Sequence, residues 1–255
     1  MNAHSRTEIA LITGASAGIG RAFALQLASR CKGLILIGRD ADKLAAVVAE
    51  LEQPGLSITS FALDLTTTEG VTRVMEAIRQ KGPVTILINN AGFASYGKFA
   101  ESDLDIEMAM VNLHCNATLA LSRAALPYMK EAGRGVVINV SSLGSFFPVK
   151  NSAVYGASKT FLNLFSQALQ QEVKADGIRV QCLCPGYTRS DFSDRELLAE
   201  LDSSKVPDEL WMSAADVAAA SIAHMDSSSE AVMCLTENNR DLANKGLMAQ
   251  AAGLL

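Results

Sequence analysis

One stretch near the start of the chain restricts the fold more than any other: residues Thr13–Gly20 read TGASAGIG. A short apolar run, Ile9–Ile12, precedes this stretch, and an amphipathic segment over about residues 21–30 follows it. Glycines let a ligand come close to the backbone, and a helix start presents free N–H groups and a partial positive charge. A glycine-rich loop can also be only a tight turn, but a strand before it and a helix after it favour a phosphate-binding corner.

Strand-like and helix-like segments alternate after this corner. Short apolar runs predict strands at Leu34–Ile37, Ile58–Leu63, Val84–Ile88, Gly135–Val140 and Ile178–Leu183. Amphipathic segments predict helices over 40–52, 67–81, 102–129 and 152–176. With no internal repeat or linker, residues 1–255 are expected to form a single α/β domain. The expected architecture is a doubly wound parallel sheet of about seven strands with helices on both faces.

Composition narrows the class of protein. The 255 residues are 49% hydrophobic, enough for a full core, and the net charge of −5 gives no basic surface for nucleic acid. The first apolar run stops at Thr13-Gly14, too short for a signal peptide or a membrane span, and no later run has the length of a span. We therefore expect a cytoplasmic protein with no nucleic-acid partner and no membrane partner.

The five cysteines and three histidines predict neither disulfides nor a metal site. The number of cysteines is odd, and none forms a Cys-x-x-Cys pair. Cys182 and Cys184 alternate in an apolar run, as on one face of a buried strand, so buried reduced thiols are expected. His4, His114 and His224 have no carboxylate or thiol at ligand spacing.

Tyr155 and Lys159 lie one turn apart on the helix predicted over 152–176, and therefore on one face of it. A phenol normally has a pKa near ~10, and a neighbouring ammonium lowers that pKa by favouring the phenolate. Such a pair can act as a general acid or base near neutral pH. Because this spacing also occurs by chance on amphipathic helices, the catalytic interpretation depends on the other motifs of the chain.

The ends of two other predicted strands carry residues suited to a dinucleotide. Many dinucleotide-binding folds have an acid at the end of the second strand, where it holds ribose hydroxyls. This chain has Gly38-Arg39 there, which suits a ribose with a 2′-phosphate, and Ser16 can add a hydroxyl. The alternative is that Arg39 is a solvated surface residue. Asn89–Gly92, after the fourth strand, fit the lip of a ligand crevice or a simple turn.

Taken together, these motifs resemble the short-chain dehydrogenase/reductases over about the first 190 residues. The matching elements are Thr13-Gly14-x-x-x-Gly18-x-Gly20, Asn89–Gly92, Asn112, Ser142, Tyr155-x-x-x-Lys159, Pro185-Gly186 and Ser190. The family usually has threonine at the last position, and serine keeps the hydroxyl. The resemblance implies a Rossmann-like fold.

The resemblance also implies a role for each matching residue. Tyr155 would donate the proton in reduction and accept it in oxidation, and Lys159 would lower its pKa and bind the nicotinamide ribose. Ser142 would hydrogen-bond the substrate oxygen, and Ser141 is the alternative that the family spacing disfavours. Asn112 would hold a water that links Lys159 to solvent. The residues expected to contact the dinucleotide are Gly14, Ser16, Gly18, Ile19, Gly20, Arg39, Asp64, Leu65, Asn90, Ala91, Gly92, Tyr155, Lys159, Pro185, Gly186 and Ser190.

In this family the segment after Pro185-Gly186 covers the substrate, and here it runs over about 187–211. Apolar and aromatic residues of this segment and of other strand ends are Phe192, Leu197, Leu198, Leu201, Trp211, Phe93, Tyr96, Phe146, Phe147 and Val149. They favour an apolar or aromatic carbonyl substrate, although any one of them can equally belong to the core.

The chain lacks the glycine-rich tail with which many relatives build a tetramer. A homodimer is expected instead, through the long helices that contain Asn112 and Tyr155, because uncovered helices would expose apolar faces.

The leading hypothesis is an NADP(H)-dependent oxidoreductase that transfers hydride between nicotinamide C4 and the carbonyl or alcohol carbon of an apolar small molecule, with Tyr155 as acid and base. One alternative is a non-catalytic nucleotide-binding regulator or scaffold of the same fold. The complete set of Asn112, Ser142, Tyr155 and Lys159 argues against that alternative. Another is NAD-dependent alcohol oxidation, against which Gly38-Arg39 argues.

Overall fold

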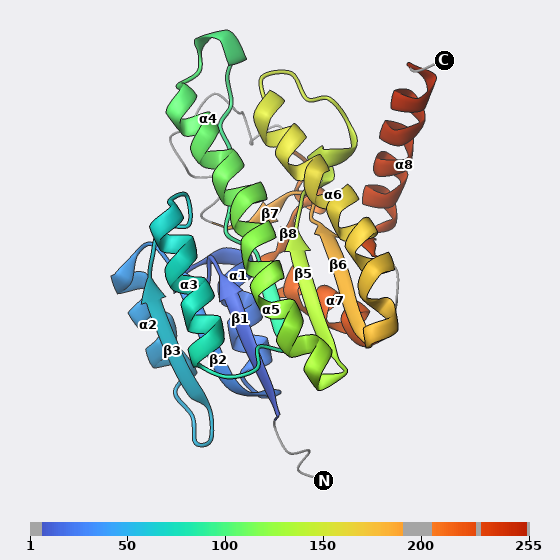
Figure 1. Ribbon diagram of the computed structural model, residues 1–255. Helices are drawn as coiled ribbons and strands as arrows, with labels where there is room; N and C mark the ends of the chain where they lie inside the picture. The colour runs from blue at the N-terminus through green and yellow to red at the C-terminus, as the bar shows by residue number, and fades with distance from the viewer. Residues whose placement is uncertain (1–6, 191–205, 228–230, 254–255) are drawn as a thin grey trace.

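The computed structural model describes residues 7–190, 206–227 and 231–253. Its centre is a seven-stranded parallel sheet with the strand order β3-β2-β1-β4-β5-β6-β9 (Figure 1). The strands are β1 Glu8–Thr13, β2 Cys31–Gly38, β3 Ser57–Ala62, β4 Ile86–Asn89, β5 Gly135–Val140, β6 Ile178–Cys184 and β9 Val232–Cys234. The predicted Rossmann-like doubly wound sheet is confirmed.

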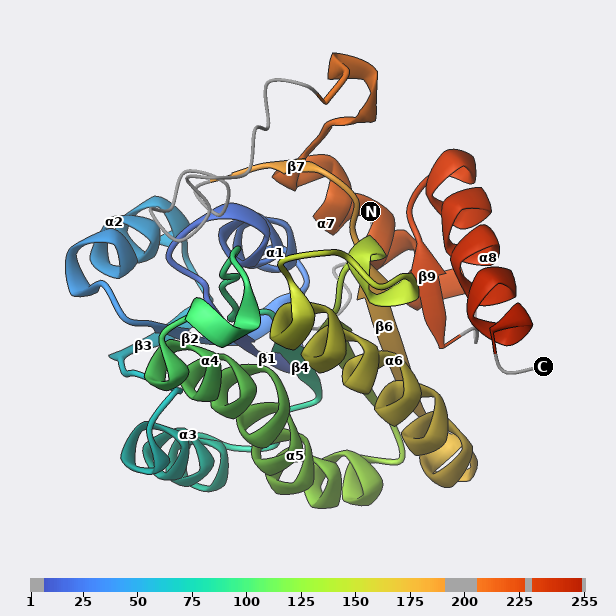
Figure 2. The same ribbon diagram turned by 90° about the horizontal axis from the view of Figure 1, so that it is seen from above.

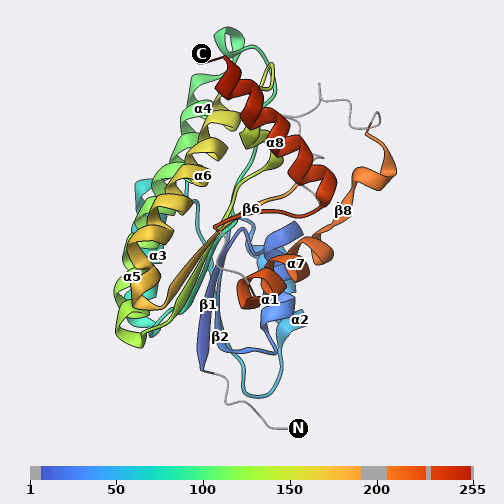
Figure 3. The same cartoon turned by 90° about the vertical axis from the view of Figure 1, so that its right-hand side faces the viewer.

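Helices cover both faces of this sheet (Figure 3). One face carries α1 Gly18–Leu27, α2 Ala41–Leu51 and α7 Ala214–Ser227. The other carries α3 Thr68–Gln80, α4 Leu104–Val111, α5 Thr118–Ala132 and α6 Ala153–Val173. The last helix, α8 Glu237–Ala252, lies beyond β9 at the edge of the sheet (Figure 2). Short 3-10 turns lie at Phe99–Glu101, Leu143–Phe146, Lys174–Asp176 and Asp208–Leu210.

The apolar strands supply a core on each face because successive side chains of a strand point to opposite sides. In β1, Ala10 and Ile12 belong to the core beneath α1 and α2, whereas Ile9 and Leu11 belong to the core beneath α3 and α5. Both cores are fully enclosed, which explains why the strands read as continuous apolar runs.

The helix predicted over 102–129 is wrong as a single α-helix. Between α4 and α5 the chain forms a π turn, Asn112–Ala117. A π turn holds one residue more than an α turn, and such turns are frequent at functional sites. Here the wider turn lets Leu113, His114 and Ala117 all be buried.

The part of the chain after Cys184 contains elements that the sequence patterns did not predict. These are α7, α8, β9 and a separate two-stranded sheet made of β7 Thr188–Arg189 and β8 Met212–Ser213. Within the described ranges, none of the helices combines the length and apolar character needed to cross a membrane.

Candidate active site

A cavity of about 730 Å³ opens at the carboxyl ends of β1, β2, β4, β5 and β6. The strand order reverses between β1 and β4, and in open α/β sheets ligands bind in the crevice outside such a switch point. Of the predicted site residues, all but Gly20 and Asn112 line this cavity. The volume suits a small organic molecule or part of a cofactor.

The glycine loop between β1 and α1 has the geometry of a phosphate cradle. Gly14 has a φ of 66°, in the left-handed region, and a Cβ atom there would lie 2.7 Å from Nδ2 of Asn90. A Cβ atom on Gly20 would overlap the carbonyl of Gly14, so α1 can pack this closely on β1 only through glycine. Ala17, which precedes α1, provides no side-chain cap, and the first N–H groups of the helix are left for a ligand.

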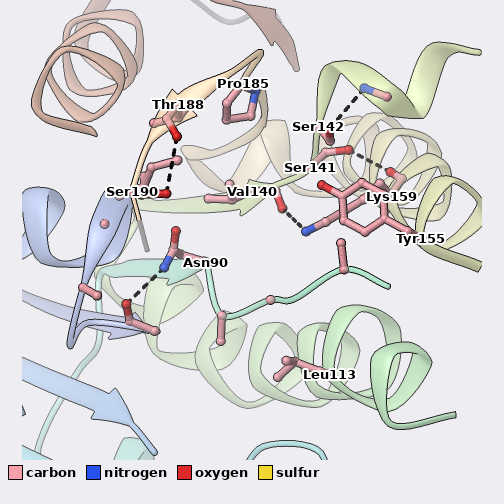
Figure 4. A pocket seen from close by; sticks show the side chains of 18 of the residues that line it. Asn90, Leu113, Val140, Ser141, Ser142, Tyr155, Lys159, Pro185, Thr188 and Ser190 are labelled. Atoms are coloured by element: carbon pink, nitrogen blue, oxygen red, sulfur yellow. Dashed lines mark hydrogen bonds between the residues drawn. The ribbon is translucent and has the colours of Figure 1, made fainter. Parts of the chain in front are cut away.

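Asn90 ties the ends of β1 and β4 together beneath this loop. Its Nδ2 donates to the carbonyl oxygen of Thr13 at 2.9 Å, and its backbone N–H donates to Oγ1 of Thr13 at 3.0 Å. The hydroxyl of Thr13 donates in turn to the carbonyl oxygen of Ile88 at 3.3 Å. Asn90 therefore shapes the glycine loop as well as lining the cavity (Figure 4).

The end of β2 forms a basic corner of the cavity. Arg39 is exposed there, and Ser16 lies opposite Gly38, where a Cβ atom would be 3.1 Å from Oγ of Ser16. Lys43, which the sequence patterns missed, also lines this corner. It comes from the first turn of α2, whose start is fixed by Asp40, because Oδ1 of Asp40 accepts from the backbone N–H of Lys43 at 3.0 Å. The available signal was an aspartate at the predicted helix start with a lysine three residues later, because that spacing places the lysine in the first turn.

At the other end of the cavity, α6 presents Tyr155 and Lys159 from one face (Figure 4). Nζ of Lys159 lies 5.9 Å from the centre of the Tyr155 ring. It donates a hydrogen bond to the carbonyl oxygen of Val140 at 2.8 Å, at the end of β5. Oγ of Ser141 donates to the carbonyl oxygen of Lys159 at 2.8 Å. These bonds hold the turn of α6 that contains Tyr155 and Lys159 against the end of β5.

The pKa values of the pair differ from the sequence-based expectation. Burial raises the pKa of the Tyr155 phenol, and a hydrogen bond with Ser142 acts in the opposite direction. Burial lowers the pKa of Lys159 to about 8, and the thiols of Cys182, Cys115 and Cys184 act in the opposite direction. In this arrangement Ser142, and not Lys159, is the group that counteracts the effect of burial on the phenol.

Ser142 and Ser141 have different surroundings. Ser142 hydrogen-bonds Tyr155 and accepts from the backbone N–H of Gly144 at 3.1 Å. Ser141 is buried with its hydroxyl on the backbone of α6. Of the two serines, Ser142 is therefore the one whose hydroxyl lies beside Tyr155.

Asn112 lies at the first position of the π turn and does not line the cavity. Its Oδ1 accepts from Nδ2 of Asn116 at 2.8 Å. Two side chains of this turn reach Ser158 on α6: Nδ1 of His114 lies 2.9 Å from its Oγ, and Sγ of Cys115 lies 4.0 Å from its carbonyl oxygen. Sequence patterns gave no sign of these contacts, because the turn and Ser158 are far apart in the chain.

The substrate side of the cavity is largely apolar. Its lining includes Tyr96, Leu143, Phe147, Val149, Tyr187, Trp211 and Leu242. Phe93, also predicted for this wall, is buried in the core beneath α3 and α5, and Phe146 is buried in a third, smaller cluster. The predicted residues Phe192, Leu197, Leu198 and Leu201 lie outside the described residues. Ser190 faces the glycine loop, since a Cβ atom on Gly18 would lie 3.1 Å from its Cβ.

Comparison with known families shows what this geometry belongs to. The family model of the short chain dehydrogenases matches residues 8–200. The chain belongs to this family. As a short-chain dehydrogenase it is an oxidoreductase, and its glycine cradle, open helix start and cavity fit the nicotinamide cofactor that the family uses.

Individual relatives and solved structures agree with this family assignment. An uncharacterized oxidoreductase of Staphylococcus saprophyticus is 32% identical over 188 residues, which are 73% of this chain and 80% of the relative. A short-chain dehydrogenase from Sphingobium yanoikuyae, solved in complex with NADPH, has a TM-score of 0.82 and 30% identity, covering 95% of this chain and 96% of that one. A bulky-bulky ketone specific alcohol dehydrogenase from Comamonas testosteroni has a TM-score of 0.79 and 28% identity, covering 96% and 95%.

Proposed function

We propose that this short-chain dehydrogenase is an NADP(H)-dependent carbonyl reductase for apolar small molecules, with Tyr155 as its acid and base. The observation that carries the proposal is the content of one cavity: a basic corner at Arg39 and Lys43, the glycine cradle between, and Tyr155, Ser142 and Lys159 at the far end. A purely regulatory nucleotide-binding protein would have no use for the last three residues.

The roles of the residues follow from their contacts. When bound, a nicotinamide cofactor supplies or accepts the hydride. Gly144 N–H donates to Ser142, so the hydroxyl hydrogen of Ser142 is directed away from that bond and can stabilise the substrate oxygen. Tyr155 donates its proton to that oxygen as negative charge develops, and burial keeps the phenol protonated until then. Preorganised donors of this kind lower a barrier by roughly 3 kcal/mol each.

The substrate class follows from the walls around Tyr155. Aromatic and aliphatic side chains from the loops after β4, β5 and β6, from Trp211 and from α8 surround this end of the cavity. An apolar wall with a few convergent hydroxyls favours a ketone or aldehyde with bulky apolar substituents. The similarity to the bulky-bulky ketone specific alcohol dehydrogenase from Comamonas testosteroni supports this assignment.

Cofactor preference is the first testable consequence. We expect wild type to prefer NADPH, and Arg39→Ala and Lys43→Ala each to lower kcat/KM for NADPH by about tenfold to a hundredfold more than for NADH. A charge-assisted hydrogen bond to the 2′-phosphate contributes roughly 1.5–3 kcal/mol, and NADH offers no partner for it. The measurement is the ratio of kcat/KM values for the two cofactors.

Lys32→Ala is the matched control for this experiment, because Lys32 is exposed at the opposite end of β2. It removes the same charge from the protein without touching the basic corner. A wild-type preference for NADH, or variants at positions 39 and 43 that behave like this control, would show that the corner does not select the phosphate. Replacing Gly38 by aspartate would be a less clean probe of cofactor choice, because the added Cβ would press on Ser16.

The decisive test of the function is a panel of ketones, aldehydes and alcohols assayed by the change in cofactor absorbance. We expect NADPH oxidation with at least one bulky apolar ketone and little activity with small polar carbonyls. NADPH binding without turnover of any member of the panel would instead favour the regulator or scaffold alternative. Faster alcohol oxidation with NAD would favour the reverse reaction.

We also propose that the enzyme forms a homodimer through α4, α5 and α6. Large apolar side chains are exposed along these helices: Leu104, Met108, Leu119 and Leu164, the last 71% exposed. An isologous helical interface would cover them. Sedimentation velocity should give twice the mass of the chain, and a monomer would contradict the proposal. A cytoplasmic location stays a prediction from the sequence.

A further inference from the structure

His114 lies in the interior between the loop after β4 and the helix α6. It comes from the π turn, and only 1% of its surface is exposed. Its ring meets the Tyr155 ring edge-on, with the ring centres 6.0 Å apart and the planes at 72°. It is thus the imidazole that packs directly against the proposed acid.

The hydrogen bonds of this ring have a definite direction. The backbone N–H of Phe93 lies 3.4 Å from Nε2, so Nε2 must accept and carries no proton. Nδ1 lies 2.9 Å from Oγ of Ser158, and Ser158 donates its own hydrogen to the carbonyl oxygen of Tyr155 at 2.9 Å. Nδ1 is therefore the protonated nitrogen, since Ser158 Oγ has its hydrogen engaged elsewhere.

These bonds form one chain that begins at Phe93, passes through His114 and Ser158, and ends at the backbone of Tyr155. Its first member adjoins Gly92, which lines the cavity at the cofactor side. A Cβ atom on Gly92 would lie 2.9 Å from Nε2 of His114 and 3.4 Å from Nζ of Lys159. The ring, the Gly92 backbone and the lysine are therefore packed without space for a further methyl group.

We propose that His114 is a positioning residue for the reaction: as a neutral Nδ1–H imidazole it sets the distance between the loop after β4 and the face of α6 that carries Tyr155 and Lys159. The inference rests on the proposed function, because the quantity that it governs is the placement of the acid relative to the bound substrate. A displacement of about 1 Å in such a site can reduce the rate by roughly a hundredfold.

The surroundings require a neutral ring. From α6 the groups that face it are the ammonium of Lys159 and the phenol of Tyr155, and from the loop after β4 they are the Phe93 ring and backbone. An imidazolium would direct a second N–H at the N–H of Phe93 and place a positive charge near Lys159. Burial, together with Lys159, accordingly lowers the pKa of His114 well below its usual value.

Histidine also matches the geometry in a way that shorter or longer amides do not. The amide nitrogen of Asn can replace Nδ1 as donor to Ser158, and the amide oxygen of Gln can replace Nε2 as acceptor from Phe93. Neither can make both bonds from opposite edges of one rigid ring. His114→Asn therefore removes the bond from Phe93, and His114→Gln removes the bond to Ser158. His114→Leu removes both bonds.

The test combines these variants with Ser158→Ala and with the double variant His114→Leu/Ser158→Ala. We expect His114→Leu to lower kcat with NADPH and the best ketone by about 10- to 100-fold. The KM for NADPH should change by less than about threefold, because the basic corner is untouched. The double variant should lose no more than the more impaired single variant, since both break the same chain. His114→Asn and His114→Gln should retain intermediate activity.

The control is His224→Gln on α7, on the opposite face of the sheet from α6 and His114, where His224 contacts Gln181 at 2.9 Å. It should leave kcat unchanged. A folded His114→Leu variant with lowered thermal stability and wild-type kcat would overturn the proposal, as would multiplicative losses in the double variant. If His114→Leu does not fold, the Asn and Gln variants decide the same question.

A second measurement does not depend on turnover. ¹⁵N-histidine NMR of the cofactor-free wild type, with the His114 signals assigned by their loss in His114→Gln, should show an Nδ1–H tautomer at neutral pH. An Nε2–H tautomer or a protonated ring would contradict the inference. If wild type reduces no carbonyl compound while His114 shows the Nδ1–H tautomer, the proposed function fails and the hydrogen-bond chain stands.

Discussion

Replacing Tyr155 by phenylalanine is expected to lower carbonyl reduction by about 10²–10⁴-fold, the range typical of general acid catalysis. The change removes one hydroxyl and keeps the ring, so the contact with His114 and the packing against the core beneath α3 and α5 remain. Because the basic corner and the glycine cradle lie at the other end of the cavity, the Kd for NADPH should stay within a few-fold of wild type. Single-turnover reduction and NADPH titration measure the two quantities.

Tyr128→Phe is the matched control, because Tyr128 lies on α5 and packs against the core away from the cavity. It should keep wild-type turnover. If Tyr155→Phe keeps its turnover, Tyr155 is not the acid. If turnover and NADPH binding are both lost, the hydroxyl serves the cofactor rather than the substrate.

Replacing Lys159 by methionine should produce opposite effects on stability and on activity. Lys159 is 4% exposed, and burial lowers its pKa from 10.5 to about 8. This shift means that keeping the lysine charged at neutral pH destabilises the folded state by roughly 3 kcal/mol. Methionine removes this destabilisation, but it also removes the hydrogen bond to the Val140 carbonyl, which contributes about 1 kcal/mol to stability. The cofactor-free variant should therefore be more stable than wild type by about 2 kcal/mol at pH 7, measured by urea unfolding.

The pH dependence identifies the source of that difference. Between pH 8 and 10.5 the unfolded lysine keeps its proton while the folded one loses it, so the unfolded state binds more protons. The free energy of unfolding of wild type then rises with pH across this window, and the variant lacks this rise. The stability difference should be largest below pH 8 and should shrink toward pH 10.5. A difference independent of pH would assign it to packing instead of charge.

Activity should fall in the same variant. Methionine cannot donate a hydrogen bond to a ribose hydroxyl and places no positive charge near the phenol. We expect weaker NADPH binding and turnover lower by at least about tenfold. A more stable but inactive protein is the signature of a residue kept for function. A destabilised variant with normal activity would contradict both parts of the prediction.

The sequence predicted the sheet well because the information is local. Strands such as Val84–Ile88 read as continuous apolar runs only where both faces are covered, and the glycines of Thr13–Gly20 are required by contacts that the structure shows. Residues at strand ends were brought to one cavity because parallel strands share a carboxyl edge. From Gly14 to Ser190, the predicted site residues other than Gly20 and Asn112 therefore line one cavity.

What the sequence did not predict depends on tertiary contacts. His114 meets Ser158 only after α4 and α6 pack together, and nothing near it in the chain signals that partner. The expected effect of Lys159 on Tyr155 differs because burial outweighs it and because Nζ donates to Val140. The three-residue strand β9 is recognisable mainly through its pairing with β6.

The extra residue of the π turn also affects how this chain can change in evolution. The wider turn holds its extra residue without changing how α4 and α5 are rotated against each other, so deleting one residue within Asn112–Ala117 would let the two helices join as one α-helix in the same rotation. Each helix is held by its own buried residues, Met110 in α4 and Leu121 in α5, and neither is free to rotate. The cost of such a deletion should therefore fall on the turn itself, which could no longer bury Leu113, His114 and Ala117 together.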